Sequence, residues 1–249
     1  MKRWRNVMKQ VSLISLLILP AGLKSQSEKP VVVLNKGIGG NNTVAALKRF
    51  DKDVLEAKPD YLIIYIGMND SVNSHGIVAL DDYKGNMQKM LDAARKNGIS
   101  PVIVTMNPVI ETYVKKRHPQ HPAGNINGYQ KTYDDAIRSL AAENNIPLVD
   151  LRKLVLEHSK SLEEKDSLLR NMANSNVEDG VHLTAEGYRE FAKLFEVVFK
   201  GKIKPGDVVV CFGDSLTFGA GMKGAGTATG DTYPAHLSEM LNRLAVNSQ

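Results

Sequence analysis

The chain has 249 residues, of which 43% are hydrophobic and 24% are charged, and its formal net charge is +5. This composition is typical of folded proteins and excludes disordered, collagen-like and fibrous classes. The excess charge lies entirely in residues 1–26, which hold five basic and no acidic residues. The rest of the chain is neutral, so we expect no nucleic-acid partner.

Residues 1–26 predict a secretory signal peptide. A basic start is followed by the apolar run Val11–Leu19 and then by Pro20 and several small residues. The run is too short for a comfortable membrane span, although an uncleaved anchor or an amphipathic first helix is the alternative. No cysteine stands directly after the run, so we expect no lipoprotein anchor. The predicted location is secreted or periplasmic, with no stable membrane association after cleavage.

Five short runs rich in β-branched residues predict strands. Each run is continuously apolar, as expected for strands that are buried on both faces of a parallel sheet. In chain order the predicted strands are Val31–Leu34, Tyr61–Ile66, Val102–Thr105, Pro147–Val149 and Val208–Phe212.

Longer segments with helical spacing of apolar residues lie between and after these strands. They are Val44–Leu55, Asp81–Lys96, Tyr129–Asn144, Ala185–Phe199 and Tyr233–Leu244. Alternating strands and helices predict an α/β fold, a doubly wound three-layer sandwich with a five-stranded parallel sheet. The only break with linker character, residues 200–207, is too short to mark a domain boundary. We therefore expect a single domain over residues 27–249.

Polar and glycine-rich loops follow four of the predicted strands. In chain order these loops contain Gly37–Thr43, Gly67–Asp70, Asp179–Thr184 and Gly213–Leu216. Loops that leave the carboxyl ends of parallel strands meet at one edge of the sheet, where ligands bind in this fold class. That edge would then hold a serine, a glycine-rich turn, an asparagine and an Asp/His pair.

These residue types suit acyl transfer. A serine hydroxyl becomes a good nucleophile when a histidine accepts its proton, and the histidine needs a carboxylate to fix its tautomer. Asp179 and His182 are three residues apart, so one turn can pair them and leave the other ring nitrogen free for Ser215. Candidate donors to the developing oxyanion are the N–H groups of Ser215 and Gly40 and the side-chain amide of Asn69.

The four loops together resemble the signature blocks of the SGNH hydrolase superfamily, also called GDSL lipases and esterases. The resemblance implies a flavodoxin-like fold, with Ser215 as nucleophile and His182 and Asp179 as the base pair. It also implies Ser215, Gly40 and Asn69 as the oxyanion hole, with no metal and no cofactor. The choice of Gly40 over Gly39 follows from matching the block and not from a physical argument.

The order of the blocks departs from the family. The serine block, in residues 207–249, comes last in this chain, whereas it comes first in the family. A circular permutation explains the order, and it predicts that the Val208 strand lies between the Val31 and Tyr61 strands. The alternative is that residues after 201 begin a truncated second domain, in which case Ser215 and His182 would never meet.

Three other motifs have weaker functional interpretations. Gly219-x-Gly221-x-x-Gly224 fits a dinucleotide-binding pattern but opens no obvious helix, so we do not expect a nucleotide. His118 and His121 have the spacing of metal ligands, but they lie beside prolines, and we expect a solvated loop there. The run at residues 115–117 is expected on a solvated surface that could border the site.

We therefore expect a secreted serine esterase that hydrolyses short acyl esters, acetyl esters above all, through an acyl-Ser215 intermediate. The form of the Asp/His block, followed by Glu186-Gly187-Tyr188, is similar to family members that act on acetylated sugars. The expected partner is therefore a glycan ester or another small ester. Two alternatives stay open: a lysophospholipase or thioesterase for longer acyl chains, and a non-catalytic carbohydrate-binding relative.

Overall fold

The structure, a computed structural model, describes residues 29–246, so the predicted signal peptide lies outside the described residues. Five strands form one all-parallel sheet in the order β1-β5-β2-β3-β4. They are β1 (Val32–Gly37), β2 (Tyr61–Tyr65), β3 (Ser100–Val104), β4 (Leu148–Val149) and β5 (Val208–Gly213). The strand at Val208 therefore lies between β1 and β2, as predicted, and the alternative of a separate second domain after residue 201 is wrong.

Helices of very different length connect the strands. The longer ones are α1 (Thr43–Phe50), α3 (Leu80–Lys96), α5 (Ile126–Glu143), α6 (Leu151–His158), α8 (Ala185–Lys193) and α11 (Tyr233–Val246). The shorter ones are the π-helix η1 (Asp51–Leu55), α2 (Met68–Ser71), α4 (Glu111–Arg117), α7 (Met172–Ser175), α9 (Glu196–Phe199) and α10 (Ser215–Phe218).

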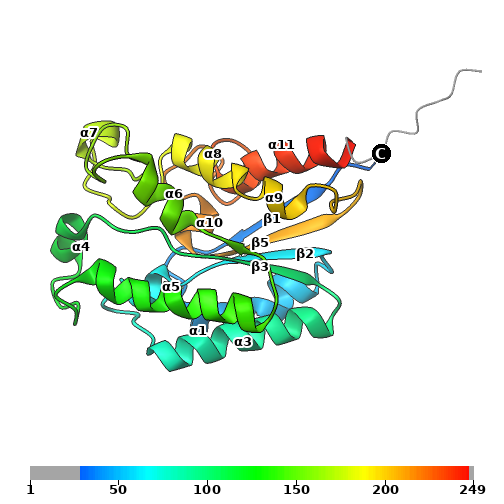
Figure 1. The fold of residues 1–249 in the computed structure, drawn as a ribbon, viewed down its shortest axis with the longest axis horizontal. Helices are drawn as coiled ribbons and strands as arrows, with labels where there is room; N and C mark the ends of the chain where they lie inside the picture. Colours follow the sequence, from blue (N-terminus) through cyan, green and yellow to red (C-terminus); the bar gives the residue numbers. More distant parts are fainter. Residues whose placement is uncertain (1–28, 247–249) are drawn as a thin grey trace, which may run out of the picture.

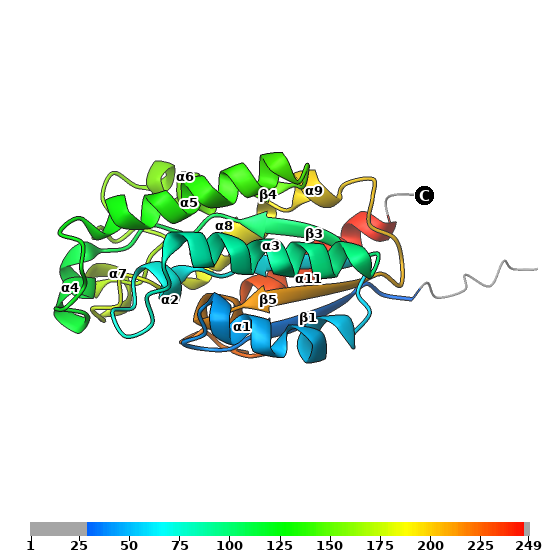
Figure 2. The same ribbon diagram turned by 90° about the horizontal axis from the view of Figure 1, so that it is seen from below.

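The helices form layers on both sides of the sheet. Helices α1, α3 and α5 cover one face, and α8, α9 and α11 cover the other (Figures 1 and 2). This arrangement is the doubly wound three-layer sandwich that the sequence predicts. No helix among residues 29–246 is long and apolar enough to cross a membrane.

Two predicted helices are interrupted. The segment Val44–Leu55 begins as α1 but continues as η1 after Phe50. The segment Ala185–Phe199 separates into α8 and α9 at Leu194 and Phe195. Thr184 accepts a hydrogen bond from the N–H of Gly187 and so caps α8, as its residue type predicts.

The strand register brings three ends to the same edge of the sheet. Gly37 at the end of β1 pairs with Gly213 at the end of β5, which in turn pairs with Tyr65 at the end of β2. Because the strands are parallel, the loops that follow them start side by side. These are three of the four loops in which the sequence predicts functional residues.

Glycine at two of these strand ends makes room for α10. A Cβ atom at Gly213 would lie 2.1 Å from the carbonyl oxygen of Tyr65, and one at Gly37 would lie 2.0 Å from the backbone nitrogen of Phe218. A side chain at Gly37 would displace the backbone of α10, and one at Gly213 would displace the end of β2 and the Thr217 side chain of α10.

An aromatic cluster supports α10 from the interior. The rings of Phe191 and Tyr233 lie 4.7 Å apart, and the ring of Tyr65 lies 5.2 Å from Phe191. The Tyr233 hydroxyl lies 3.3 Å from Oγ1 of Thr217 in α10. Ser215 is therefore presented by a short helix that rests on a rigid, fully buried surface.

Candidate active site

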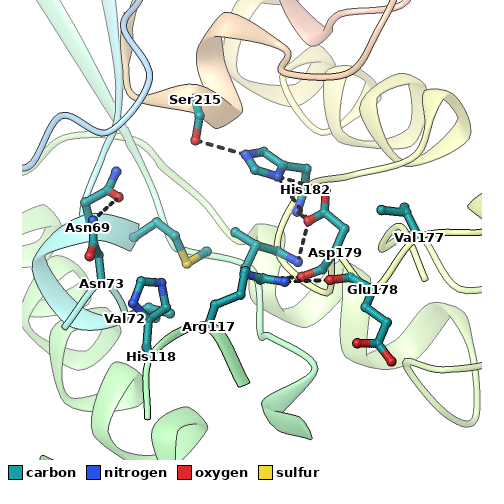
Figure 3. A pocket seen from close by; sticks show the side chains of 12 residues that line it. Asn69, Val72, Asn73, Arg117, His118, Val177, Glu178, Asp179, His182 and Ser215 are labelled. Atoms are coloured by element: carbon teal, nitrogen blue, oxygen red, sulfur yellow. Dashed lines mark hydrogen bonds and ion pairs between the residues drawn. The ribbon is translucent and has the colours of Figure 1, made fainter. Parts of the chain in front are cut away.

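A cavity of about 390 Å³ opens at the carboxyl edge of the sheet. Figure 3 shows Ser215 and His182 along it, with Asn69, Val72, Asn73 and His118 on one side and Val177, Glu178 and Asp179 on the other. The asparagine, Asp/His and serine loops, which are far apart in sequence, thus line one space. The glycine-rich loop adds no residue to this wall but lies next to Ser215.

Ser215 and His182 are in hydrogen-bonding contact. Ser215 is the first residue of α10, and its Oγ lies 3.0 Å from Nε2 of His182. This distance is the one required for a histidine to accept the serine proton.

Asp179 contacts the opposite side of the His182 ring. Its two carboxylate oxygens lie 3.0 and 3.1 Å from Nδ1 of His182, and Oδ1 also accepts the N–H groups of Val181 and His182. Burial alone would raise the pKa of Asp179, but the His182 ring and these N–H groups outweigh it and lower the pKa to about 2. A carboxylate that is ionised at neutral pH therefore fixes the ring orientation.

Asn69 lies behind the serine, near the start of α2. Its Nδ2 donates to the carbonyl of Asn41 at 3.0 Å and to Oδ2 of Asp214 at 3.4 Å. The amide group is therefore held between the glycine loop and the serine loop, and Asn69 lines the cavity together with Ser215.

The glycine-rich loop before α1 brings backbone donors to the same region. A Cβ atom at Gly39 would lie 3.9 Å from Cβ of Ser215, whereas Gly40 has a φ of 76° and open space around its Cβ position. Within residues 29–246, the N–H groups of Gly40 and Ser215 have no acceptor. The choice between Gly39 and Gly40 as the donor stays a prediction.

A buried carboxylate joins the glycine loop to α2. Asp70 is fully buried and accepts the N–H and the hydroxyl of Thr43, the first residue of α1. Burial raises the pKa of Asp70 to about 6, against the opposing effect of the two Thr43 donors. The contact between Asp70 and Thr43 therefore holds the end of the glycine-rich loop next to Asn69.

A second buried carboxylate lies directly before the nucleophile. Asp214 is fully buried and caps α10 by accepting the N–H of Leu216 at 2.9 Å. Burial raises the pKa of Asp214 to about 7, although the Leu216 N–H and the nearby His182 ring oppose this shift.

Two arginines near the Asp/His pair have contacts that the sequence analysis did not predict. Arg117, at the end of α4, donates to the carbonyl of Glu178 at 2.6 Å and to that of Asp179. Arg170 lies 3.3 Å from Oδ2 of Asp179. The run at residues 115–117 therefore borders the site, as the sequence allowed.

The segment that holds His118 and His121 is a loop, as predicted, but it is less solvated than expected. His118 lines the cavity and its Nδ1 lies 3.2 Å from Oγ of Ser74, while Nε2 of His121 lies 2.9 Å from the carbonyl of Ser71. Both residues are half-buried, and both rings contact the chain at the end of α2 and just after it. Among the described residues, no group of three or more His, Cys, Asp or Glu side chains could hold a metal ion.

Comparison with known families gives one clear match. A sequence model of the GDSL-like lipase/acylhydrolase family matches residues 18–190. The matched range contains the glycine, asparagine and Asp/His loops, and it ends before Ser215.

Individual relatives match a similar part of the chain. An uncharacterized lipoprotein, YqeF, of Bacillus subtilis is 30% identical over 67% of this chain and 73% of its own length. A rhamnogalacturonan acetylesterase, RhgT, of the same organism is 27% identical over 66% of this chain and 72% of its own. Among solved structures, the acetyl xylan esterase AlAXEase is 28% identical, with a TM-score of 0.53 over 66% of this chain and 78% of that one.

Proposed function

This chain belongs to the GDSL-like lipase/acylhydrolase family, and from that premise we propose that it is a secreted serine esterase for short acyl esters of carbohydrates, acetyl esters above all. Membership makes it a carboxylic ester hydrolase. The observation that carries the proposal is the 3.0 Å contact between Oγ of Ser215 and Nε2 of His182 at the wall of the cavity.

The first half of the proposed reaction acylates Ser215. His182 takes the Ser215 proton on Nε2 while Oγ attacks the ester carbonyl, and Asp179 stabilises the imidazolium that forms. The tetrahedral intermediate then collapses, the bond to the alcohol oxygen breaks, and His182 returns the proton to the departing alcohol. The products of this half are a free carbohydrate hydroxyl and an acyl-Ser215 ester.

The second half hydrolyses the acyl-enzyme. His182 removes a proton from a water molecule while the water oxygen attacks the acyl carbonyl. When the intermediate collapses, the bond between the acyl carbon and Oγ breaks, the carboxylic acid leaves, and His182 passes the proton to Oγ of Ser215. Both steps need only these side chains and water, so the proposed mechanism uses no metal and no cofactor.

Three donors are proposed to stabilise the negative oxygen of each tetrahedral intermediate. They are the N–H groups of Ser215 and Gly40 and the Nδ2 group of Asn69. One such donor typically contributes about 3 kcal/mol to the transition state. The unpaired N–H groups of Ser215 and Gly40 within the described part of the chain, and the restrained amide of Asn69, support this assignment.

The composition of the cavity wall supports a carbohydrate alcohol. Asn73, Arg117, His118 and Glu178 line it beside Ser215 and His182, among apolar side chains such as Met68 and Val72, so polar residues are available where the alcohol would lie. Sugars are bound through such convergent polar groups. The acetylesterase relatives act, by their names, on rhamnogalacturonan and acetyl xylan, which supports the same substrate class.

The proposal includes a signal peptide over residues 1–26, a single domain over residues 27–249 and a circularly permuted order of the family blocks. The family match that ends at residue 190 and the central position of β5 support the permutation.

Labelling with a fluorophosphonate, followed by peptide mapping, tests the proposed function. An adduct on Ser215 that is absent in S215A is the expected result, because only an activated serine reacts at an appreciable rate. Folded protein that gives no adduct, yet binds glycans equally well with and without Ser215→Ala, would favour a non-catalytic carbohydrate-binding protein instead.

A further inference from the structure

The backbone of Arg170 is built into the turn that carries the Asp/His pair. Leu169 forms an antiparallel bridge with Leu183, and the N–H of Arg170 donates to the carbonyl of His182 at 2.9 Å. The N–H of Gly180 in turn donates to the carbonyl of Arg170 at 2.8 Å. The position of Arg170 is therefore fixed relative to Asp179 and His182 by hydrogen bonds on both of its sides.

The side chain of Arg170 supplies a second hydrogen-bonding partner, besides the His182 ring, for Oδ2 of Asp179. Oδ1 of Asp179 already accepts two backbone N–H groups, whereas Oδ2 has only the His182 ring besides the Nη1 group of Arg170 at 3.3 Å. The side chains of Arg170 and Asp179 are 21% and 12% exposed. An ion pair this well shielded from water restrains the rotation of a carboxylate far more than a surface pair does.

The guanidinium also packs against the loop that follows Ser215. Gly221 has a φ of 80°, and a Cβ atom there would lie 2.1 Å from Nη1 and 2.9 Å from Cζ of Arg170. Gly221 belongs to the Gly219-x-Gly221-x-x-Gly224 motif, which the proposed reaction does not otherwise use. A glycine at this position lets the loop from the serine block lie directly on the guanidinium.

Arg170 thus touches both halves of the proposed catalytic machinery. It contacts the carboxylate of the Asp/His loop on one side and the serine-bearing loop on the other. Arg117, the other cation near Asp179, reaches only the backbone carbonyls of Glu178 and Asp179. Among the described residues, Arg170 is the only arginine or lysine paired with the Asp179 carboxylate.

We propose that Arg170 is a positioning residue of the esterase, which holds the Asp179 carboxylate against Nδ1 of His182 and so directs Nε2 toward Ser215. The inference rests on the proposed function, because it assigns Arg170 a role in the same reaction. It also gives Gly221 a role, since a larger residue there would displace the guanidinium from Asp179.

Kinetics of Arg170→Met and Arg170→Lys on p-nitrophenyl acetate test the proposal. R170M is expected to lower kcat about tenfold to hundredfold with KM within about twofold of wild type, because a misoriented base loses rate and not binding. R170K is expected to recover part of the loss. R138M is the matched control: it removes a comparable arginine–aspartate pair, Arg138 with Asp150, outside the cavity, and its kcat should equal that of wild type.

A pH profile separates positioning from a general loss of structure. The charged and titratable groups that face this region are Arg170 and His182 at the Asp179 carboxylate, Arg117 at its carbonyl, and Asp214 and Tyr188 behind them. Because Arg170 is paired with the Asp179 carboxylate, the pH dependence of kcat/KM should change in R170M and stay in place in R138M.

A double-mutant cycle decides whether Arg170 acts through Asp179. In the Asp179→Asn background, R170M should change kcat by less than about twofold, because the carboxylate it holds is gone. The proposal would be overturned if R170M lowered kcat by the same factor in the Asp179→Asn background as in wild type. It would also be overturned by an R170M variant with wild-type kcat and an unchanged pH profile. Should R170M not fold, R170Q supplies the same comparison. A wild-type protein that neither labels at Ser215 nor hydrolyses the ester would instead overturn the proposed function.

Discussion

Asn242, close to the end of α11, hydrogen-bonds both backbone groups of Val31, the residue before β1. Its Oδ1 accepts the N–H of Val31 at 2.9 Å and its Nδ2 donates to the carbonyl at 3.1 Å. The last described helix and the first strand are thus adjacent in space although 211 residues separate them in sequence. In the family, α10 and α11 would precede β1 directly, so this contact lies where a permuted chain would have been opened.

Restoring the order of the blocks tests this interpretation. A chain opened between Gly201 and Lys202, with Val246 joined to Lys29 by a short glycine–serine linker, keeps every strand and helix and changes only the connectivity. We expect it to fold and to label at Ser215 at a rate within a few-fold of the original chain. Opening the chain within β5 is the control that should not fold. A reordered chain that fails to fold would show that the fold depends on the present connectivity.

The Ser215–His182–Asp179 arrangement predicts unequal losses of activity. Ser215→Ala and His182→Ala should each lower kcat by several orders of magnitude, because each removes an essential proton donor or acceptor. Asp179→Asn should lower kcat less than His182→Ala, because the amide keeps an acceptor oxygen for the N–H groups of Val181 and His182 and leaves the proton-accepting ring in place. Circular dichroism of each variant checks that the fold is intact. An Asp179→Asn loss as large as that of His182→Ala would contradict the prediction.

Much of the fold and the Asp/His pair is predictable because it depends on local sequence. Strands that are buried on both faces are continuous apolar runs, and Asp179 and His182 are close enough in sequence for one turn to pair them. The match to family blocks allowed β5 to be placed in the middle of the sheet even though it is last in the chain.

The contacts of Arg170 and the short helices could not be predicted in this way. Arg170 is placed beside Asp179 by the pairing of Leu169 with Leu183 and by the loop after α10, which packs on the guanidinium. Both contacts join segments that are apart in sequence, so no local sequence pattern indicates them. Helices of four residues, such as α2 and α10, are too short to show the repeat of the hydrophobic pattern that would reveal them.

The size of the cavity predicts a preference for short acyl groups. A space of about 390 Å³ must accept both the acyl group and part of the alcohol. We expect kcat/KM for p-nitrophenyl esters to fall steeply beyond butyryl, by roughly tenfold or more at octanoyl, because a longer acyl chain does not fit this space together with the alcohol. A rate that rises from acetyl to octanoyl would favour a lysophospholipase or thioesterase.

His118 is predicted to contact the carbohydrate and not the acyl group. Burial, then the charges of Arg117, His75 and His121, lower the pKa of His118, so its ring is neutral near pH 7 and can share a hydrogen bond with a sugar hydroxyl. His118→Ala should raise KM for an acetylated xylo-oligosaccharide about fivefold, the effect of one hydrogen bond, with a smaller effect on p-nitrophenyl acetate. His121→Ala, which alters a histidine outside the cavity, is the control. Equal changes of KM for both esters would contradict a sugar contact.

The buried carboxylates of Asp70 and Asp214 predict that the protein is more stable in mild acid than at neutral pH. The pKa values of Asp70 and Asp214 are raised to about 6 and about 7 in the fold, whereas the unfolded chain has ordinary carboxyl groups. Between the unfolded and folded pKa values the native state binds more protons, so the free energy of unfolding falls as pH rises through this window. At about 1.4 kcal/mol per pKa unit, this loss should be on the order of 3 kcal/mol for Asp70 and 4 kcal/mol for Asp214.

Urea unfolding at pH 4.5 and pH 7.5 measures the effect, and Asp70→Asn separates the contribution of one group. The amide introduced by this substitution keeps the Oδ1 acceptor that Thr43 uses but cannot ionise. The difference in free energy of unfolding between the two pH values should therefore be smaller in D70N than in wild type. The exposed Asp81, with 97% of its side chain accessible, is the matched site for a control Asp→Asn substitution, which should leave that difference unchanged. Equal pH dependence in wild type and D70N would mean that Asp70 ionises in the folded protein as readily as in the unfolded chain.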